Sequence, residues 1–198
     1  DEVTEIFIRI NSKGTALSQS DFVMSKMAAD TIHAGSLMRK TVDYFCHLAV
    51  KPDFYSQLTH DAEFQASKYA DKIKWLAKDY DDIYNPDYGD MLRVSFMHQF
   101  RRGKLADLVS LLSGRDFETR EFKIEIEERS FNQLHEAVLQ AVNQTNYERY
   151  LMIVRSAGIV KKSLIRSQNV LNFGYALFLA LRERKVDSNQ IEKIVRKW

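Results

Sequence analysis

The sequence predicts an all-α fold, with a single compact domain of roughly ten helices that covers residues 1–198. Two observations support this prediction. The chain contains only 7 Gly and 2 Pro, too few for a turn-rich β fold but well suited to long helices. Apolar residues make up 45% of the chain, and in most segments they recur at helical spacing.

The N-terminal segment predicts two helices joined at a polar corner. The corner is the sequence NSKGT, residues 11–15, in which Gly14 allows the positive φ of a chain leaving a helix. Ser18 and Asp21 then form the N-cap and first-turn carboxylate of the next helix. The apolar residues that mark the two helices are Val3, Ile6, Phe7 and Ile10 in the first, and Phe22, Val23, Met27 and Ala28 in the second.

The middle of the chain predicts a helix over residues 37–50, ended by Pro52, and a longer polar helix over residues 61–80. The clearest break is DDIYNPDYGD, residues 81–90. Helices over residues 91–100 and 105–112 follow it. Residues 117–130 alternate like a strand around Phe122, but their flanking charges favour a helix.

The last third predicts four helices. Ser130 with Gln133 is expected to form a capping box, and Asn146 is expected to be the N-cap of a helix that Gly158 closes. The most apolar helix spans residues 170–181, and its i, i+4, i+8 positions are expected to face the core: Phe173, Leu177 and Leu181. A final helix starts at Ser188.

The composition limits the classes of protein to which this chain could belong. The single cysteine, Cys46, allows no internal disulfide, and no signal peptide is visible, so we expect a cytoplasmic protein. The longest apolar run is too short to span a membrane. Because the chain opens with Asp and ends abruptly at Trp198, we expect a fragment of a longer protein.

Known sites of chemistry are not recognisable. The five histidines show no metal-ligand spacing, and the acidic residues of 79–90 lack the order of a calcium loop, so no metal site is predicted. No phosphate-cradling glycine loop and no nucleophile elbow occurs. The residues alone therefore predict a helical module without a reaction.

Basic residues gather in two clusters that could contact phosphates: Arg101, Arg102 and Lys104, and Arg155, Lys161, Lys162 and Arg166. The alternative is that they are solvated helix ends, where cations complement the helix dipole. The net charge of +2 favours neither interpretation.

The stretch EIFIRINSKGTALSQSDFVMSK, residues 5–26, resembles a signature of a large bacterial family. Its members share the N-terminal domain of GmrSD-type, modification-dependent restriction endonucleases, with a ParB/sulfiredoxin-like fold. Later blocks resemble the helical region of one branch of this family: FRRGKLADLVSLLSGRDFETR, NYERYLMIVRSAG, LIRSQNVLNFGYALFLALRE and IEKIVRKW.

The resemblance implies the helical scaffold of a DNA-restriction or phage-defence protein, between a nucleotide-hydrolysing domain and an effector nuclease. The family's D-G-Q-Q-R and H-N-H motifs are absent from these 198 residues, so the resemblance implies no activity and no cofactor for this fragment. For the parent protein it implies a nucleoside triphosphate, a divalent metal and DNA. It assigns the corner residues Asn11, Ser12, Gly14 and Thr15 to the contact with the flanking nucleotide domain. The alternative is a nucleic-acid-binding module that uses the two basic clusters.

Overall fold

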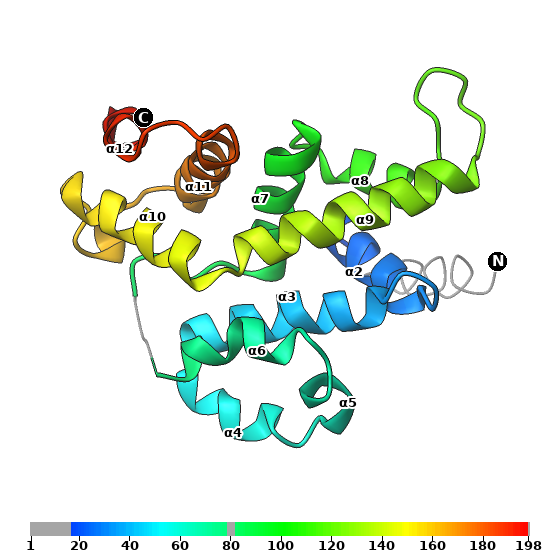
Figure 1. Ribbon diagram of the computed structural model, residues 1–198, viewed down its shortest axis with the longest axis horizontal. Coiled ribbons are helices and arrows are strands. Elements are labelled where there is room, and N and C mark those ends of the chain that lie inside the picture. Colours follow the sequence, from blue (N-terminus) through cyan, green and yellow to red (C-terminus); the bar gives the residue numbers. More distant parts are fainter. Residues whose placement is uncertain (1–16, 79–81, 198) are drawn as a thin grey trace.

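The computed structural model describes residues 17–78 and 82–197, and within these ranges the protein is all-α (Figure 1). The described residues form eleven α-helices and three short 3-10 helices, and the only extended pairing among them is a single antiparallel bridge between Arg115 and Phe122. The predicted fold class is confirmed. The α-helices are α2 (Gln19–Ala29), α3 (Gly35–Val50), α4 (Tyr55–Leu58), α5 (Ala62–Gln65), α6 (Ala70–Ile73), α7 (Tyr88–Phe100), α8 (Leu105–Leu112), α9 (Ile124–Ala141), α10 (Gln144–Ser156), α11 (Gln168–Glu183) and α12 (Ser188–Lys197).

Helix α2 begins as the sequence predicts. The Ser18 hydroxyl accepts a hydrogen bond from the backbone N–H of Asp21, and the Asp21 carboxylate accepts from the backbone N–H of Ser18. The second oxygen of Asp21 accepts from the Tyr88 hydroxyl at 2.6 Å. This capping box therefore also fixes the start of α2 against the start of α7.

The predicted helix over residues 61–80 is wrong. Its described part is divided into α5, α6 and the 3-10 turn Lys74–Ala77. The Ser67 hydroxyl donates to the carbonyl of Phe64 at 2.6 Å, where it competes with the helical backbone pattern just after α5. With the 3-10 turn Pro52–Phe54 and α4, these pieces form a short-helix segment, residues 52–77, that packs under α3 (Figure 1).

Helix α7 is the centre of the fold and packs between α9 and α11. A buried tyrosine cluster lies beside it, formed by Tyr84, Tyr147, Tyr150 and Tyr175. Each hydroxyl donates a hydrogen bond: Tyr84 to Asn172 Oδ1, Tyr147 to the carbonyl of Tyr84, Tyr150 to that of Leu171, and Tyr175 to that of Ala141. The cluster thus joins α10 and α11 to the segment before α7 with every hydroxyl satisfied.

Helix α9 is longer than predicted because it runs straight through Ser130, which is buried in its interior rather than capping a new helix. The helix begins only at Ile124. The residues before it form a loop in which Asp116 accepts hydrogen bonds from the backbone of Glu118 and Thr119.

The cap of α10 is Asn143, whose side chain accepts from the backbone N–H of Asn146. Asn146 is buried within the helix instead, and its amide donates to the carbonyl of Gln140 at 2.9 Å. The expected cap at Asn146 is therefore wrong by three residues. Gly158 closes the helix, as predicted, with a φ of +94°.

The predicted core face of α11 is also wrong. Phe173 is 47% exposed, and Leu177 and Leu181 are only partly buried. The helix packs against α7 on one side and against α12 and α10 on another, and this rotates its buried face by one to two residues. The residues that the core actually buries are Leu171, Tyr175, Phe178 and Leu179.

Within the described ranges, no helix has the length and apolar composition that a bilayer span requires.

Candidate nucleic-acid interface

The corner residues that the family resemblance singles out, Asn11, Ser12, Gly14 and Thr15, lie outside the described residues. Their predicted contact with a flanking domain stays a prediction. The two basic clusters lie within the described part and can be compared directly.

The first basic cluster is largely neutralised. It follows the end of α7, where Arg101 takes up the left-handed conformation, with a φ of +56°. The Arg101 guanidinium pairs with Glu183 at 3.0 Å, and that of Arg102 pairs with Asp107 at 3.1 Å. Arg102 also lies over the Phe117 ring, with 4.6 Å between its guanidinium carbon and the ring centroid. Of this cluster only Lys104, exposed before α8, forms no ion pair within the described residues.

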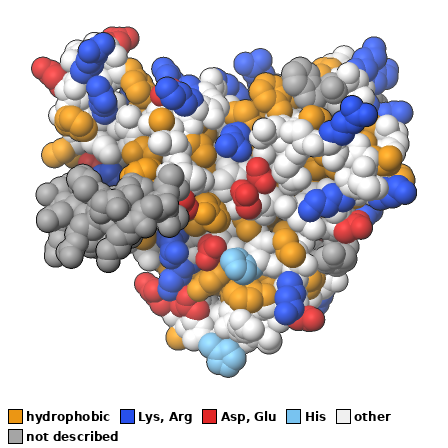
Figure 2. Space-filling view, turned by 180° about the vertical axis from the view of Figure 1, so that it is seen from behind, with side chains coloured by type: hydrophobic (Ala, Val, Ile, Leu, Met, Phe, Trp, Pro, Cys, Tyr) orange, Lys and Arg blue, Asp and Glu red, His pale blue; other side chains and the backbone are white. Residues whose placement is uncertain are grey.

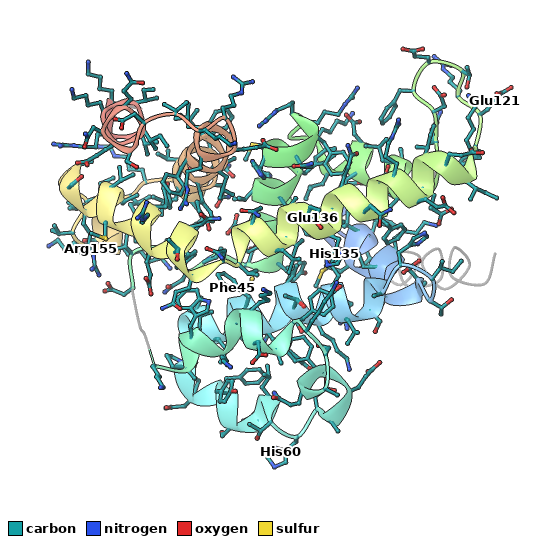
Figure 3. The ribbon with its side chains drawn as sticks, viewed as in Figure 1. Phe45, His60, Glu121, His135, Glu136 and Arg155 are labelled. Carbon is teal, nitrogen blue, oxygen red and sulfur yellow. The ribbon has the colours of Figure 1, made fainter. Side chains whose placement is uncertain are left out.

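The second basic cluster is exposed to solvent. Arg155 is exposed in the last turn of α10, and Lys161, Lys162 and Arg166 are exposed in the connection to α11. In the part of the chain that the structure describes, Lys161, Lys162 and Arg166 form no ion pair. Figure 3 places Arg155 at the far end of α10, well away from Glu121 in the loop before α9.

The second cluster belongs to a larger C-terminal basic region, which we define as the Lys and Arg residues of 144–197. This stretch holds eleven Lys and Arg against four Asp and Glu, a net charge of +7, whereas the whole chain carries +2. Ten of the eleven cations are exposed, and Figure 2 shows Lys and Arg side chains along the side on which α10, α11 and α12 lie. The members beyond the predicted cluster are Arg149, Arg182, Arg184, Lys185, Lys193, Arg196 and Lys197.

Sequence reasoning missed these additional residues because it searched for runs of adjacent cations. The charge balance of the segment would have found them without a structure. What the sequence could not supply is the packing of α12 against α10 and α11.

A cavity of about 530 Å³ opens between α10, α11 and α12. Its polar lining is formed by Arg149, Ser156, Arg182, Ser188 and Glu192, and its apolar lining by Met152, Ile153, Phe178, Val186 and Ile191. It is therefore a cationic and apolar hollow within the basic region.

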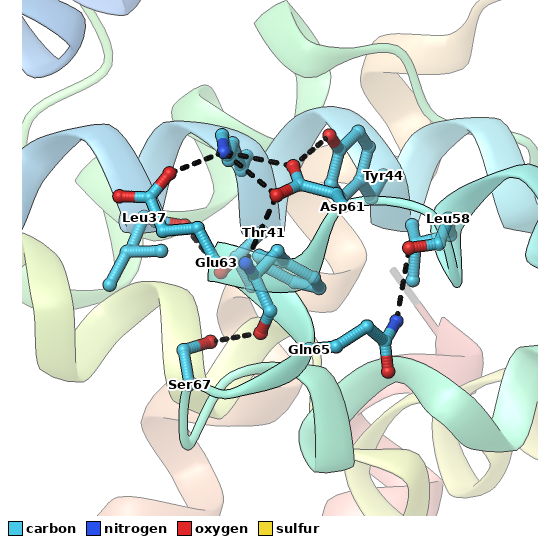
Figure 4. Close-up of polar contacts among 10 residues, drawn as sticks. Leu37, Thr41, Tyr44, Leu58, Asp61, Glu63, Gln65 and Ser67 are labelled. Atoms are coloured by element: carbon cyan, nitrogen blue, oxygen red, sulfur yellow. Dashed lines mark hydrogen bonds and ion pairs between the residues drawn. The ribbon is translucent and has the colours of Figure 1, made fainter.

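The densest polar network lies elsewhere and is structural. Asp61 accepts hydrogen bonds from Lys40, from the Tyr44 hydroxyl at 2.7 Å and from the backbone of Phe64 (Figure 4). Lys40 also pairs with Glu63 at 2.7 Å. The Lys40 and Tyr44 donors lower the pKa of Asp61 to about 2, and burial with the Asp61 hydrogen bond raises the pKa of Tyr44 to about 12. Because these groups satisfy one another, the network fastens the short-helix segment to α3.

The remaining titratable groups do not assemble a metal site within the described ranges, where no three His, Cys, Asp or Glu side chains converge. Cys46 is buried, and this burial raises the pKa of its thiol. His98 is 3% exposed, and burial lowers the pKa of its imidazole because it disfavours the charged form.

No protein-family model, curated protein or solved structure matches this chain.

Proposed function

We propose that this chain is the helical region of a DNA-restriction or phage-defence protein, and that its C-terminal basic region contacts the DNA backbone. The resemblance of residues 5–26 and of the later blocks supports the first part. The observation that carries the second part is the net charge of +7 in residues 144–197, on exposed side chains that are mostly without ion pairs in the described structure. Lys and Arg in such a region displace the counterions of a phosphate backbone.

The contact would be to phosphates rather than to base edges. Lys161, Lys162 and Arg166 lie in the connection between α10 and α11, and the 3-10 turn Lys162–Leu164 within it is too short to enter a groove. Phosphate contacts position a protein on DNA without reading its sequence. This module would then hold DNA while a flanking domain of the parent recognises or cleaves it.

A second role concerns the other end of the chain. By resemblance, the corner at Asn11, Ser12, Gly14 and Thr15 supports a nucleotide-hydrolysing domain that uses a nucleoside triphosphate and a divalent metal. Asn11→Ala in the intact parent should then lower nucleotide hydrolysis at least about tenfold, the factor given by 1.4 kcal/mol of lost transition-state stabilisation. Hydrolysis within about twofold of wild type, in a variant that remains folded, would contradict this role.

The DNA contact is tested by titrating a fluorescent duplex with the chain over a range of salt concentrations. The triple variant Lys161→Gln, Lys162→Gln, Arg166→Gln should weaken binding and lower the salt slope by about 2–3, since each lost phosphate contact removes about 0.9. The matched control is Lys51→Gln, Lys72→Gln, Lys78→Gln, which removes three exposed cations in and beside the short-helix segment. Equal losses in the two triple variants would mean that DNA senses only the total charge, and the proposal would be wrong.

A further inference from the structure

The cavity between α10, α11 and α12 is lined by two kinds of side chain. The polar ones include two guanidinium groups, Arg149 from α10 and Arg182 from α11, together with the hydroxyls of Ser156 and Ser188. The others are apolar. A cavity that combines cations with an apolar wall favours an anion that carries an apolar body.

Arg182 is the more enclosed of the two cations. Its Nη1 atom is buried and has no hydrogen-bond partner among the described residues. Its guanidinium carbon lies 5.9 Å from the centroid of the Phe178 ring, so the side chain is held along the cavity wall. Because Arg182 is partly buried, solvent screens its charge less than that of an exposed cation, and this strengthens its attraction for an anion in the cavity.

Arg182 also borders a second cavity of about 370 Å³, lined by His98, Glu136 and Glu183 among others. The two carboxylates there oppose an anion. In the first cavity the only carboxylate is Glu192, which lies 3.5 Å from Arg196, and a second cation, Arg149, is present. Charge thus favours the first cavity as the place where an anion meets Arg182.

The apolar lining residues decide the kind of anion. Met152 is 67% exposed on α10, and Ile153 and Ile191 line the same cavity. Inorganic phosphate would leave this wall uncovered, whereas a planar base would cover it and could hydrogen-bond to Ser156, Ser188 or Glu192 at its edge. The volume of about 530 Å³ lies within the range of pockets that take ligands of nucleotide size.

We infer that the cavity between α10, α11 and α12 binds a nucleoside monophosphate group, with its phosphate on Arg149 and Arg182 and its base against Met152 and Ile153. This site is distinct from the proposed contacts of Lys161, Lys162 and Arg166 with the DNA backbone. An experiment can therefore contradict one proposal without contradicting the other. The group can come from a free nucleotide or from the phosphorylated end of a DNA strand.

Calorimetric titration of the full chain tests the site with three probes: deoxyadenosine 5′-monophosphate, deoxyadenosine and inorganic phosphate. The nucleotide should bind at least about tenfold more tightly than either part alone, because it alone contacts both the cations and the apolar side chains of the lining. Arg182→Gln and, separately, Arg149→Gln should each weaken nucleotide binding by about tenfold or more. The matched control is Arg184→Gln, an exposed cation just beyond α11 that does not line the cavity, and its affinity should equal wild type.

Circular dichroism and the melting temperature establish that each variant is folded, and the Arg149 variant keeps the test valid if Arg182→Gln unfolds. Nucleotide binding no tighter than that of inorganic phosphate would overturn the inference. So would equal affinities of the Arg149, Arg182 and Arg184 variants. A 5′-phosphorylated oligonucleotide that competes with the nucleotide, while its unphosphorylated form does not, would identify a DNA end as the source. Absence of competition by both would identify the free nucleotide.

Discussion

The short-helix segment and the C-terminal helices α10–α12 use charge in opposite ways. In the first, Asp61, Lys40 and Glu63 neutralise one another and fasten four-residue helices that have little core of their own. In the second, the buried tyrosine cluster holds the helices, and the cations remain on the surface. The charges of the short-helix segment are paired with one another, whereas exposed cations without ion pairs on a well-packed element are available to a ligand.

The largest effect should come from the core that anchors the C-terminal helices. Leu179→Ala should lower the free energy of unfolding by about 2–5 kcal/mol, the range for truncating a buried Leu. Phe173→Ala, on the exposed side of the same helix, should cost under about 1 kcal/mol. Urea denaturation of both variants measures the difference, and a larger loss for Phe173→Ala would restore the core face that the sequence predicts.

Tight packing against the tyrosine cluster gives the next effect. A Cβ on Gly174 would lie 2.7 Å from the Tyr150 hydroxyl oxygen, which is buried and bonded to Leu171. Gly174→Ala should therefore cost about 1–3 kcal/mol through overpacking. Gly103→Ala is the control, because its Cβ would meet nothing closer than 3.7 Å. Equal melting temperatures for the two variants would show that the tyrosine cluster accommodates the added methyl group without a loss of stability, and would contradict this prediction.

The short-helix segment should be the acid-sensitive part. The pKa of Asp61 is lowered to about 2, so its contribution is present above about pH 4 and is lost as the pH falls towards about 2. Asp61→Asn should cost about 1 kcal/mol at neutral pH and show a smaller further loss at pH 3 than wild type. Asp116, whose pKa is also about 2, remains in both proteins as the common background. Denaturation curves at pH 7 and pH 3 measure the effect, and identical acid losses would contradict it.

The smallest change in stability should follow from the C-terminal basic region. The triple variant at Lys161, Lys162 and Arg166 should unfold within about 0.5 kcal/mol of wild type, because these side chains form no ion pairs within the described structure. Thermal unfolding checks this. A loss above about 1 kcal/mol would mean that these cations stabilise the fold, and the contrast between the two regions would disappear.

Local signals in the sequence predicted what local contacts decide. The Ser18 and Asp21 capping box, the span of α8 over 105–112 and the stop at Gly158 depend on neighbouring residues alone, and all were predicted correctly. Ser130 and Asn146 carry the same signals, but they are buried inside helices by packing from other elements, so those caps failed.

The candidate site also has a part that the sequence predicts and a part that it does not. The second basic cluster was identifiable as a run of residues, whereas the neutralisation of Arg101 by Glu183 joins positions far apart in the chain. The cavity lined by Arg149 and Arg182 needs three helices packed together. No local sequence pattern predicts that these three helices pack together. Only the excess of positive charge in residues 144–197 could be recognised in the sequence.

The hydrogen bond from the Tyr84 hydroxyl to the side chain of Asn172 has a consequence for synthesis on the ribosome. The two residues are 88 positions apart, and the buried amide of Asn172 also donates to Asp90. When the first half of the protein has left the ribosome, the hydrogen-bond partner of Tyr84 is therefore still missing. It becomes available only when α11 emerges. Because such distant contacts close late, this part of the core should remain open until almost the whole chain has been translated. A chain that stops before α11 would expose Tyr84 and Tyr147, and it is this truncated product that we expect to aggregate.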